Sequence, residues 1–473
     1  MDERPNIVFI MSDDHAAHAM SCYSGRINRT PNLDRIANEG MRLDNCFCTN
    51  SICTPSRAVI LAGTYNHINK VYTLKTKMDN TLPTYPKLLH DAGYQTGMFG
   101  KWHLGQGAEH CPTGFDDWAV LPGQGLYHNP HFIFKDDSAP GGRREIVNGY
   151  VTDIIGDMTV DFIRNRDPQK PFCVMCHHKA PHRPWEPDEK HAAMYLNEDI
   201  PEPETLYDTY ENRSAAAADA HMRVGVHMRF EDVKAGINYD MPEMNLRKWA
   251  YQYYIKDYLR VIASIDDNVG KVLDELDAQG IADNTIVIYT SDQGFFLGDH
   301  GWFDKRFMYE ESLRMPFVIR YPKGIKAAQA SNDFAVNVDF AKTFLDYAGV
   351  EAPAGFQGTS LRPLLEQNVP DDWQTSMYYR YWMHDNHHMV RAHYGVRTHK
   401  HKLICFYNDG LDMEGARDEK FPLEWELFDL EKDPCEMKSV YDDPAYADTV
   451  KELKAELYRL QSEVGDERYS GVP

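Results

Sequence analysis

The sequence predicts an α/β fold built on a mostly parallel sheet, with a smaller α+β unit at its C-terminal end. Residues 7–11, 172–176 and 285–289 are short apolar runs with the composition of buried parallel strands. Each run stops at polar residues, and helical patterns separate the runs along the chain. Strands that alternate with helices form doubly wound sheets, which bind ligands at the carboxyl ends of their strands. The sequence therefore predicts one site to which three distant segments contribute.

Three helices have recognisable ends. Thr30-Pro31 supplies a capping residue and a proline at the first helical position, and Gly40 ends this first helix. Residues 82–92 form a second helix of the same type. Residues 251–279 have the pattern of a long amphipathic helix. These helices are expected to cover the faces of the sheet.

The chain is long enough for more than one domain. Residues 1–365 are predicted to form a catalytic domain and residues 366–473 a small α+β domain with an antiparallel sheet. Residues 186–245 are polar and irregular, and we interpret them as an insertion over the core of the first domain. The β-like runs of the small domain, which precede a helix at 445–464, are 377–382, 394–398, 402–406 and 425–429.

Charge and composition exclude several classes of partner. The chain has 50 basic and 72 acidic residues, whereas nucleic acids and anionic membranes require a broad basic surface. No apolar run approaches the roughly 20 residues of a membrane-spanning helix. The N-terminus lacks the features of a signal peptide, and nine cysteines without framework spacing indicate reduced thiols. We expect a cytoplasmic protein, or one from which a leader has been removed.

A set of short motifs resembles the signatures of one enzyme family. Cys53-Thr54-Pro55-Ser56-Arg57 is similar to the sulfatase signature Cys-x-Pro-x-Arg, in which the cysteine is oxidised to formylglycine. Further matches occur in the family's order between residues 13 and 306. They are Asp13-Asp14, Gly100-Lys101-Trp102-His103-Leu104-Gly105, Ala180-Pro181-His182, Ser291-Asp292-Gln293-Gly294 and Asp304-Lys305-Arg306. Each match alone is weak, but the ordered set is specific.

By this resemblance the chain is identified as a formylglycine-dependent type I sulfatase of the alkaline-phosphatase superfamily. The resemblance implies the superfamily's mixed, mostly parallel central sheet, flanked by helices, and a partner maturase that converts Cys53 to formylglycine. The hydrated aldehyde carries two hydroxyls on one carbon. One attacks sulfur to give a covalent sulfo-enzyme intermediate, and the other loses its proton so that sulfate leaves by elimination. A serine nucleophile has no second hydroxyl and could not release sulfate by this elimination.

The resemblance also implies a metal ion. Asp13, Asp14, Asp292 and Gln293 supply oxygen ligands of the kind that Ca²⁺ prefers. In the family these positions, together with the modified Cys53, surround one calcium ion. Gln293 stands where the family more commonly has asparagine, and Mg²⁺ is the alternative ion. A hard cation acidifies and orients the attacking hydroxyl.

Five cationic side chains complete the site implied by the resemblance. Arg57 and Lys101 hold the hydrated formylglycine, and His103 deprotonates its second hydroxyl. Lys305 binds sulfate oxygens, where charge builds in the transition state. His182 gives a proton to the leaving alcohol, a role suited to imidazole near neutral pH.

The substrate implied is a small sulfated saccharide. Asp304 and Arg306 flank Lys305 in a segment that resembles a sugar-binding element of sulfatases acting on the 6-O-sulfate of N-acetylglucosamine. His393 resembles a further sugar contact from the small domain. These matches favour N-acetylglucosamine-6-sulfate, or a short glycan that carries it, as released in the degradation of glycosaminoglycans or mucins.

Two other functions stay open. The first is a phosphonate or phosphodiester hydrolase of the same superfamily. The second is a non-catalytic binder of sulfated glycans in which Cys53 is never modified. The sequence does not predict the oligomeric state. A dense histidine tract fits no closed metal site and is typical of a polar cleft; it comprises His384, His387, His388, His393, His399 and His401.

Overall fold

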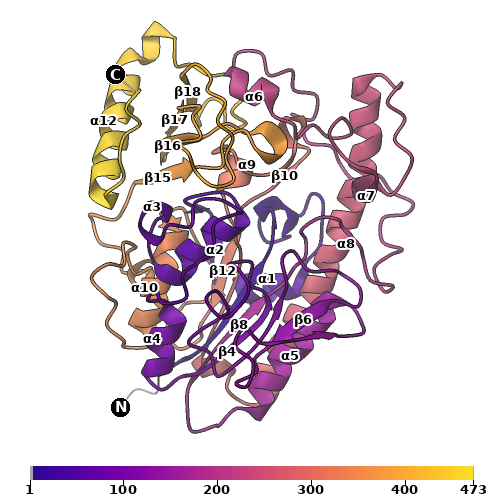
Figure 1. Ribbon diagram of the computed structural model, residues 1–473, viewed down its shortest axis with the longest axis vertical. Helices are drawn as coiled ribbons and strands as arrows, with labels where there is room; N and C mark the ends of the chain where they lie inside the picture. Colours follow the sequence, from indigo (N-terminus) through magenta and orange to yellow (C-terminus); the bar gives the residue numbers. More distant parts are fainter. Residues whose placement is uncertain (1–3, 472–473) are drawn as a thin grey trace.

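The computed structural model describes residues 4–471, which form a large sheet and a small sheet, lower and upper in Figure 1. Five neighbouring strands in the middle of the large sheet, β9, β1, β8, β4 and β5, run parallel. The predicted mostly parallel sheet is thereby confirmed. In spatial order its strands are β13 (Gln329–Ser331), β2 (Met41–Leu43), β12 (Phe317–Arg320), β9 (Thr285–Ser291), β1 (Asn6–Ser12), β8 (Phe172–His177), β4 (Gln95–Lys101), β5 (Asp117–Leu121), β6 (His131–Phe134) and β7 (Arg143–Ile146).

Residues 7–11 of the central strand β1 are all apolar because helices cover both faces of the sheet. Ile7, Phe9 and Met11 belong to the core cluster on the side of α2, α4 and α10. Val8 and Ile10 belong to the cluster on the side of α1, α5 and α8. These helices are α1 (Pro31–Asn38), α2 (Cys53–Ala62), α4 (Tyr85–Asp91), α5 (Val151–Asn165), α8 (Glu243–Ala278) and α10 (Phe340–Tyr347).

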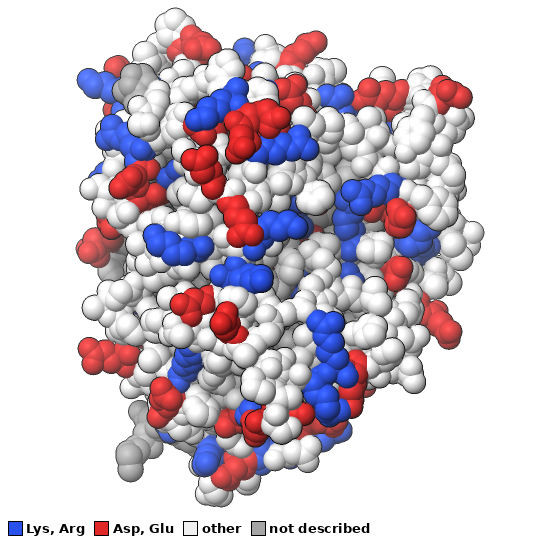
Figure 2. All heavy atoms as spheres, in the orientation of Figure 1, with Lys and Arg blue, Asp and Glu red and all other residues white. Residues whose placement is uncertain are grey.

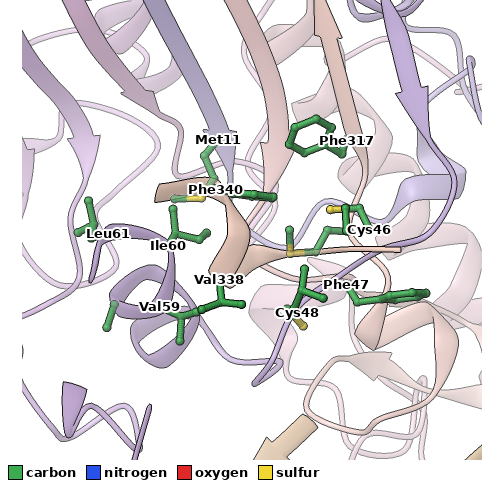
Figure 3. Packing of buried hydrophobic residues seen from close by; sticks show 14 of the residues in the cluster. Met11, Cys46, Phe47, Cys48, Val59, Ile60, Leu61, Phe317, Val338 and Phe340 are labelled. Carbon is green, nitrogen blue, oxygen red and sulfur yellow. The ribbon is translucent and has the colours of Figure 1, made fainter. Parts of the chain in front are cut away.

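Helix α2 is buried along its entire length. Figure 3 shows its Val59, Ile60 and Leu61 packed beside Val338, in the turn before α10, and Phe340, the first residue of α10. A helix buried on every side lies within the core of its domain. Its first turn, and with it Cys53, is therefore held inside the molecule at the end of the sheet.

Two predicted helix starts differ from the structure. The long helix α8 begins at Glu243, after Pro242, and not at 251, because Leu246 and Ala250 are already buried against the core. Helix α4 begins at Tyr85 and not at 82, because Thr84 keeps an extended backbone at the N-cap. Within the segment predicted as an insertion, 186–245, the regular elements are α6 (Ala215–Asp219), α7 (Phe230–Val233) and the start of α8.

The small sheet is antiparallel, as predicted, and one face packs on the C-terminal helix α12 (Ala447–Val464). Leu453, Leu457 and Leu460 of α12 lie in one cluster with Tyr394 and Leu427 of the sheet. The boundary at residue 365 stays a sequence-based prediction. The strands are β15 (Ser376–Tyr381), β16 (His393–Thr398), β17 (His401–Phe406) and β18 (Glu424–Asp429).

The remaining elements are short. Two-stranded ribbons join β10 (Phe296–Leu297) to β11 (Phe303–Asp304) and β3 (Cys46–Phe47) to β14 (Ala335–Val336). Helices α3 (Asn66–Asn69), α9 (Glu310–Leu313) and α11 (Arg362–Leu365) lie in connections. Over residues 4–471, no helix has both the length and the apolar character needed to cross a bilayer.

Gly100, near the end of β4, lets this strand lie very close to the backbone of β8 beside the site. Gly100 has a φ of +107°, and a Cβ added there would lie 2.0 Å from the His177 carbonyl oxygen of β8. We expect Gly100→Ala to destabilise the protein by about 1–3 kcal/mol and to lower the urea midpoint of unfolding. Gly25→Ala is the control, because its Cβ meets nothing within 4 Å. Equal midpoints for the two variants would contradict this account of the packing.

Candidate active site

Two acidic segments meet where parallel neighbours β1 and β9 end. Ser12 pairs with Ser291 in the register of these strands, so Asp13 and Asp14 lie beside Asp292. The backbone N–H of Asp14 donates to Asp292 Oδ1 at 3.2 Å. One carboxylate oxygen from each of the three aspartates lies within 4.8 Å of the others, and all three side chains are buried. The predicted convergence of distant segments is therefore present.

Cys53 lies at the first position of α2 and faces this acidic group. Its Sγ is 3.3 Å from Asp13 Oδ1. One helical turn later, Arg57 donates through Nε to Asp292 Oδ2 at 2.9 Å and through Nη1 to the Lys101 carbonyl at 2.7 Å. Burial raises the pKa of the Cys53 thiol to about 12, and Asp292 and Asp14 add to this shift. Unmodified, residue 53 is thus a neutral thiol and a poor nucleophile.

The predicted lysines reach the same group from two sides. Lys101 ends β4, and its Nζ contacts Asp13 Oδ2 and Gln124 Oε1. Lys305 Nζ donates to Asp14 Oδ2 at 2.7 Å. Burial lowers the pKa of Lys101 well below its usual value. Burial also opposes the charge of Lys305, but Asp14 and Asp304 outweigh it, so the pKa of Lys305 is raised.

Both predicted histidines lie at the centre. His182 Nε2 is 3.8 Å from Asp14 Oδ2, and one nitrogen of the ring lies within 4.8 Å of the Cys53 sulfur. Its Nδ1 is 2.7 Å from the Arg183 carbonyl, an acceptor, so Nδ1 carries a proton and Nε2 faces the reacting centre. His103 Nδ1 is 3.3 Å from Thr54 Oγ1. Burial, reinforced by Lys101, lowers the pKa of both rings well below the usual value.

The acidic group fits a metal ion. Burial raises the pKa of Asp14 to about 6, and the charges of Asp292 and Asp304 add to the shift, whereas Lys305 opposes it. The buried Gln293 amide donates through Nε2 to Asp14 Oδ1, while its Oε1 has no hydrogen-bond partner. Three carboxylates and a spare amide oxygen are the donors that a hard divalent cation uses. Asp13, Asp14, Asp292 and Gln293 are the residues that would hold it.

A cavity of about 600 Å³ opens from Cys53 towards solvent. His182, Lys305, Asp304 and Arg306 also line it. The segment around Lys305 is unusual, since Asp304 and Arg306 have φ values of +81° and +95°. Such strain in non-glycine residues is typical of functional sites. Figure 2 shows lysine and arginine side chains on both sides of a hollow in the middle of this face, interspersed with acidic ones.

His393 does not reach the cavity, and the predicted substrate contact is corrected here. The side chain lies in β16, is fully buried, and is enclosed by the rings of Tyr379, Tyr381 and Phe406. Its Nδ1 lies 2.8 Å from the Arg391 carbonyl. The alternation of side chains along β16 directs this histidine into the core between the two sheets.

His388, from the same histidine tract, lies on the cavity wall where His393 does not. It lines the cavity, its Nε2 is 3.2 Å from Asp304 Oδ2, and its Nδ1 is 2.9 Å from the His221 carbonyl. The histidine tract indicated a polar cleft, but the spacing of its histidines did not show which of them line the cavity. His387 lies beside it on the cavity wall.

Sequence reasoning also missed three residues near the centre. Gln124 follows β5, another parallel strand, and contacts Lys101; the rule that the carboxyl ends of parallel strands converge could have found it. Lys179 is buried, with Nζ 4.5 Å from the ring centre of Tyr127, and burial lowers the pKa of Lys179 to about 8. Tyr127 donates to the His182 carbonyl at 2.7 Å.

Cys53 lies between carboxylates and cations at the carboxyl end of a parallel sheet, an arrangement that suits hydrolysis of an anionic ester. Sequence comparison assigns the chain to a family. The sulfatase family profile matches residues 5–350. The profile of the C-terminal part of N-sulphoglucosamine sulphohydrolase matches residues 298–463. This chain belongs to the sulfatase family, and it is a sulfuric ester hydrolase.

Two relatives and one solved structure are named for sulfated forms of glucosamine or N-acetylglucosamine. An N-acetylglucosamine-6-O-sulfatase of Bacteroides thetaiotaomicron is 43% identical over 98% of this chain and 87% of its own length. A human N-acetylglucosamine-6-sulfatase is 27% identical over 80% of this chain and 67% of its own length. The structure of a protein in complex with its substrate D-glucosamine-2-N,6-O-disulfate is 43% identical, with a TM-score of 0.88 and 98% of both chains covered.

The fold extends to other chemistry. A phosphonate monoester hydrolase of Agrobacterium radiobacter superposes with a TM-score of 0.77 over 98% of this chain and 96% of its own, at 18% identity. This likeness shows the shared α/β architecture and confirms the predicted fold class. It does not decide the ester that is cleaved.

Binding of a divalent ion to the acidic group should stabilise the native protein. An ion that binds only the folded state raises stability by about 2.7 kcal/mol at a concentration 100 times its Kd. We expect millimolar Ca²⁺ or Mg²⁺ to raise the melting temperature after chelator treatment, and Asp14→Asn to abolish most of this rise. Asp339→Asn, at a buried aspartate outside the site, is the control and should keep it. If neither ion changes the melting temperature of the wild-type protein, the proposed metal site is contradicted.

Proposed function

We propose that this sulfatase removes the 6-O-sulfate of N-acetylglucosamine, as the free sugar or at the end of a short glycan. The observation that carries the proposal is the 43% identity to an N-acetylglucosamine-6-O-sulfatase over nearly the whole chain. The cavity supports it, because Asp304 and Arg306 lie beside Lys305 on its wall. A 6-O-sulfate on a flexible CH₂ arm would reach Cys53 while the ring stays near these two residues.

In the proposed reaction, Cys53 is first converted by a maturase to formylglycine. Its hydrate supplies one hydroxyl that attacks sulfur and a second whose deprotonation releases sulfate. Arg57 contacts Asp292, and Lys101 contacts Asp13. These contacts hold both cations beside residue 53, where they can orient its hydroxyls. His103, two residues after Lys101, accepts the proton of the second hydroxyl.

Lys305 and His182 serve the sulfate and the leaving sugar. Lys305 lines the cavity and offers an ammonium to the sulfate oxygens, where negative charge increases in the transition state. His182 presents Nε2 to the centre because Nδ1 is bound to the Arg183 carbonyl. A bound sulfate favours the protonated imidazole by its opposite charge, and the imidazolium can then give the Nε2 proton to the leaving oxygen.

We propose Ca²⁺ as the ion held by Asp13, Asp14, Asp292 and Gln293. Ca²⁺ accepts carboxylate and amide oxygens in a range of coordination geometries, whereas Mg²⁺ demands near-octahedral geometry and usually keeps several waters. When bound, the ion would acidify the attacking hydroxyl and offset the repulsion among the three aspartates. The four side chains come from two loops only, which keeps their relative positions fixed.

A panel of esters tests the proposal. Matured protein should hydrolyse N-acetylglucosamine-6-sulfate with a kcat/KM at least tenfold above that for the 3-sulfate of the same sugar or for galactose-6-sulfate, since each misplaced polar contact costs about 1–3 kcal/mol. An aryl phosphonate should react more slowly than the matching aryl sulfate. Preference for another sulfate position would refute the substrate, and preference for the phosphonate would refute sulfate hydrolysis as the main activity.

The role of His182 predicts a dependence on the leaving group. Loss of a general acid lowers rates by about 10²–10⁴. We expect His182→Ala to lower kcat by this amount for the sugar sulfate but by far less for 4-nitrophenyl sulfate, whose leaving group needs no proton. His90→Ala on α4, a surface histidine, is the control. A similar loss for both substrates would remove His182 from the role of proton donor.

A further inference from the structure

A second cavity adjoins the substrate cavity. Its volume is about 360 Å³, and Leu74 lines both cavities. Thr54 and His103 line the second cavity, so it too lies beside the catalytic centre. None of the functions assigned above uses it. A ligand that extends beyond the first cavity past Leu74 would enter this space.

The charge of the second cavity is positive. Lys75 and Lys77 line it, both are exposed, and among residues 4–471 no carboxylate oxygen lies within 4.0 Å of either ammonium. None of its described lining residues is acidic, although the whole chain has 72 acidic and only 50 basic residues. The first cavity, in contrast, includes Glu231 and Asp232. A purely cationic concavity in an acidic protein attracts anions.

The loop that carries the two lysines is fixed by its own threonines. The N–H of Thr73 donates to Thr76 Oγ1 at 2.9 Å, and this hydroxyl donates back to the Thr73 carbonyl at 2.9 Å. The N–H of Lys75 donates to Thr73 Oγ1 at 3.2 Å. Met78 then anchors the loop to Leu104 through a backbone hydrogen bond of 2.9 Å. An ordered loop loses less entropy on binding, which favours a ligand site.

We propose that this second cavity is an anion subsite, which binds a sulfate or carboxylate group on the sugar next to the one that is desulfated. The inference rests on the proposed function, because it takes a 6-sulfated sugar to occupy the first cavity. The neighbouring sugar crosses Leu74 and places its anionic group between Lys75 and Lys77. The preferred substrate is then a disaccharide or longer fragment with a second negative charge, and not the free monosaccharide.

The test compares kcat/KM for three substrates: the 6-sulfated monosaccharide, a disaccharide with an uncharged neighbour, and the same disaccharide with a uronate or sulfated neighbour. Two exposed ion pairs are worth about 1 kcal/mol together, or about fivefold. The wild type should prefer the charged disaccharide by this factor, and Lys75→Gln/Lys77→Gln should abolish the preference. Lys326→Gln/Lys451→Gln, at lysines outside the lining of both cavities, makes the same charge change and should keep it.

Binding supplies a second readout that needs no formylglycine. The Kd of the Cys53→Ser chain for the charged disaccharide, measured by calorimetry, should rise about fivefold with the lysine substitutions. This change in Kd does not require turnover, so it would be seen even if the proposed desulfation were wrong. The binding assay therefore tests the subsite independently of the proposed function. An equal loss of activity on all three substrates would overturn the subsite. So would a change confined to inhibition by inorganic sulfate, because the cavity would then hold the released product.

Discussion

Three buried carboxylates within 4.8 Å of one another are the constraint on which the rest of the site depends. Desolvation of each charge costs several kcal/mol, and mutual repulsion adds to that cost, so positive charge must lie among them. Arg57 and Lys101 meet Asp292 and Asp13, and Lys305 meets Asp14. The same positive charges can bind the oxygens of a sulfate ester. Charge balance of the fold and affinity for the substrate therefore have one physical origin.

The fold supplies the rigidity that such a cluster requires. Parallel pairing of β1 with β9 sets the two acidic turns side by side, and the fully buried helix α2 fixes Cys53 against them. Strain concentrates at the same place, since Asp14, His103 and Asp304 have φ values of +70°, +58° and +81°. Each such residue costs about 1–3 kcal/mol, which the surrounding packing must offset.

Sequence patterns predicted those parts that local chemistry determines. Apolar runs that end in Asp13-Asp14 and Asp292-Gln293 identified parallel strands and the site at their carboxyl ends. His393 shows the limit: its motif resembled a sugar contact, but only the register of β16 shows that the ring points into the core. The contact of His388 with Asp304 likewise depends on a loop that no short-range pattern specifies. Tertiary packing, which also extended α8 to Glu243, accounts for these differences.

The central claim is that residue 53 becomes the nucleophile of this charge cluster, and the mass of its peptide tests it most directly. Protein from the native host, or produced together with a maturase, should yield a Cys53 peptide lighter by the difference between CH₂SH and CHO. An aldehyde-trapping reagent should capture that peptide. A peptide that carries only unmodified cysteine, in protein that nevertheless binds sulfated sugars, would contradict the account and indicate a glycan-binding protein.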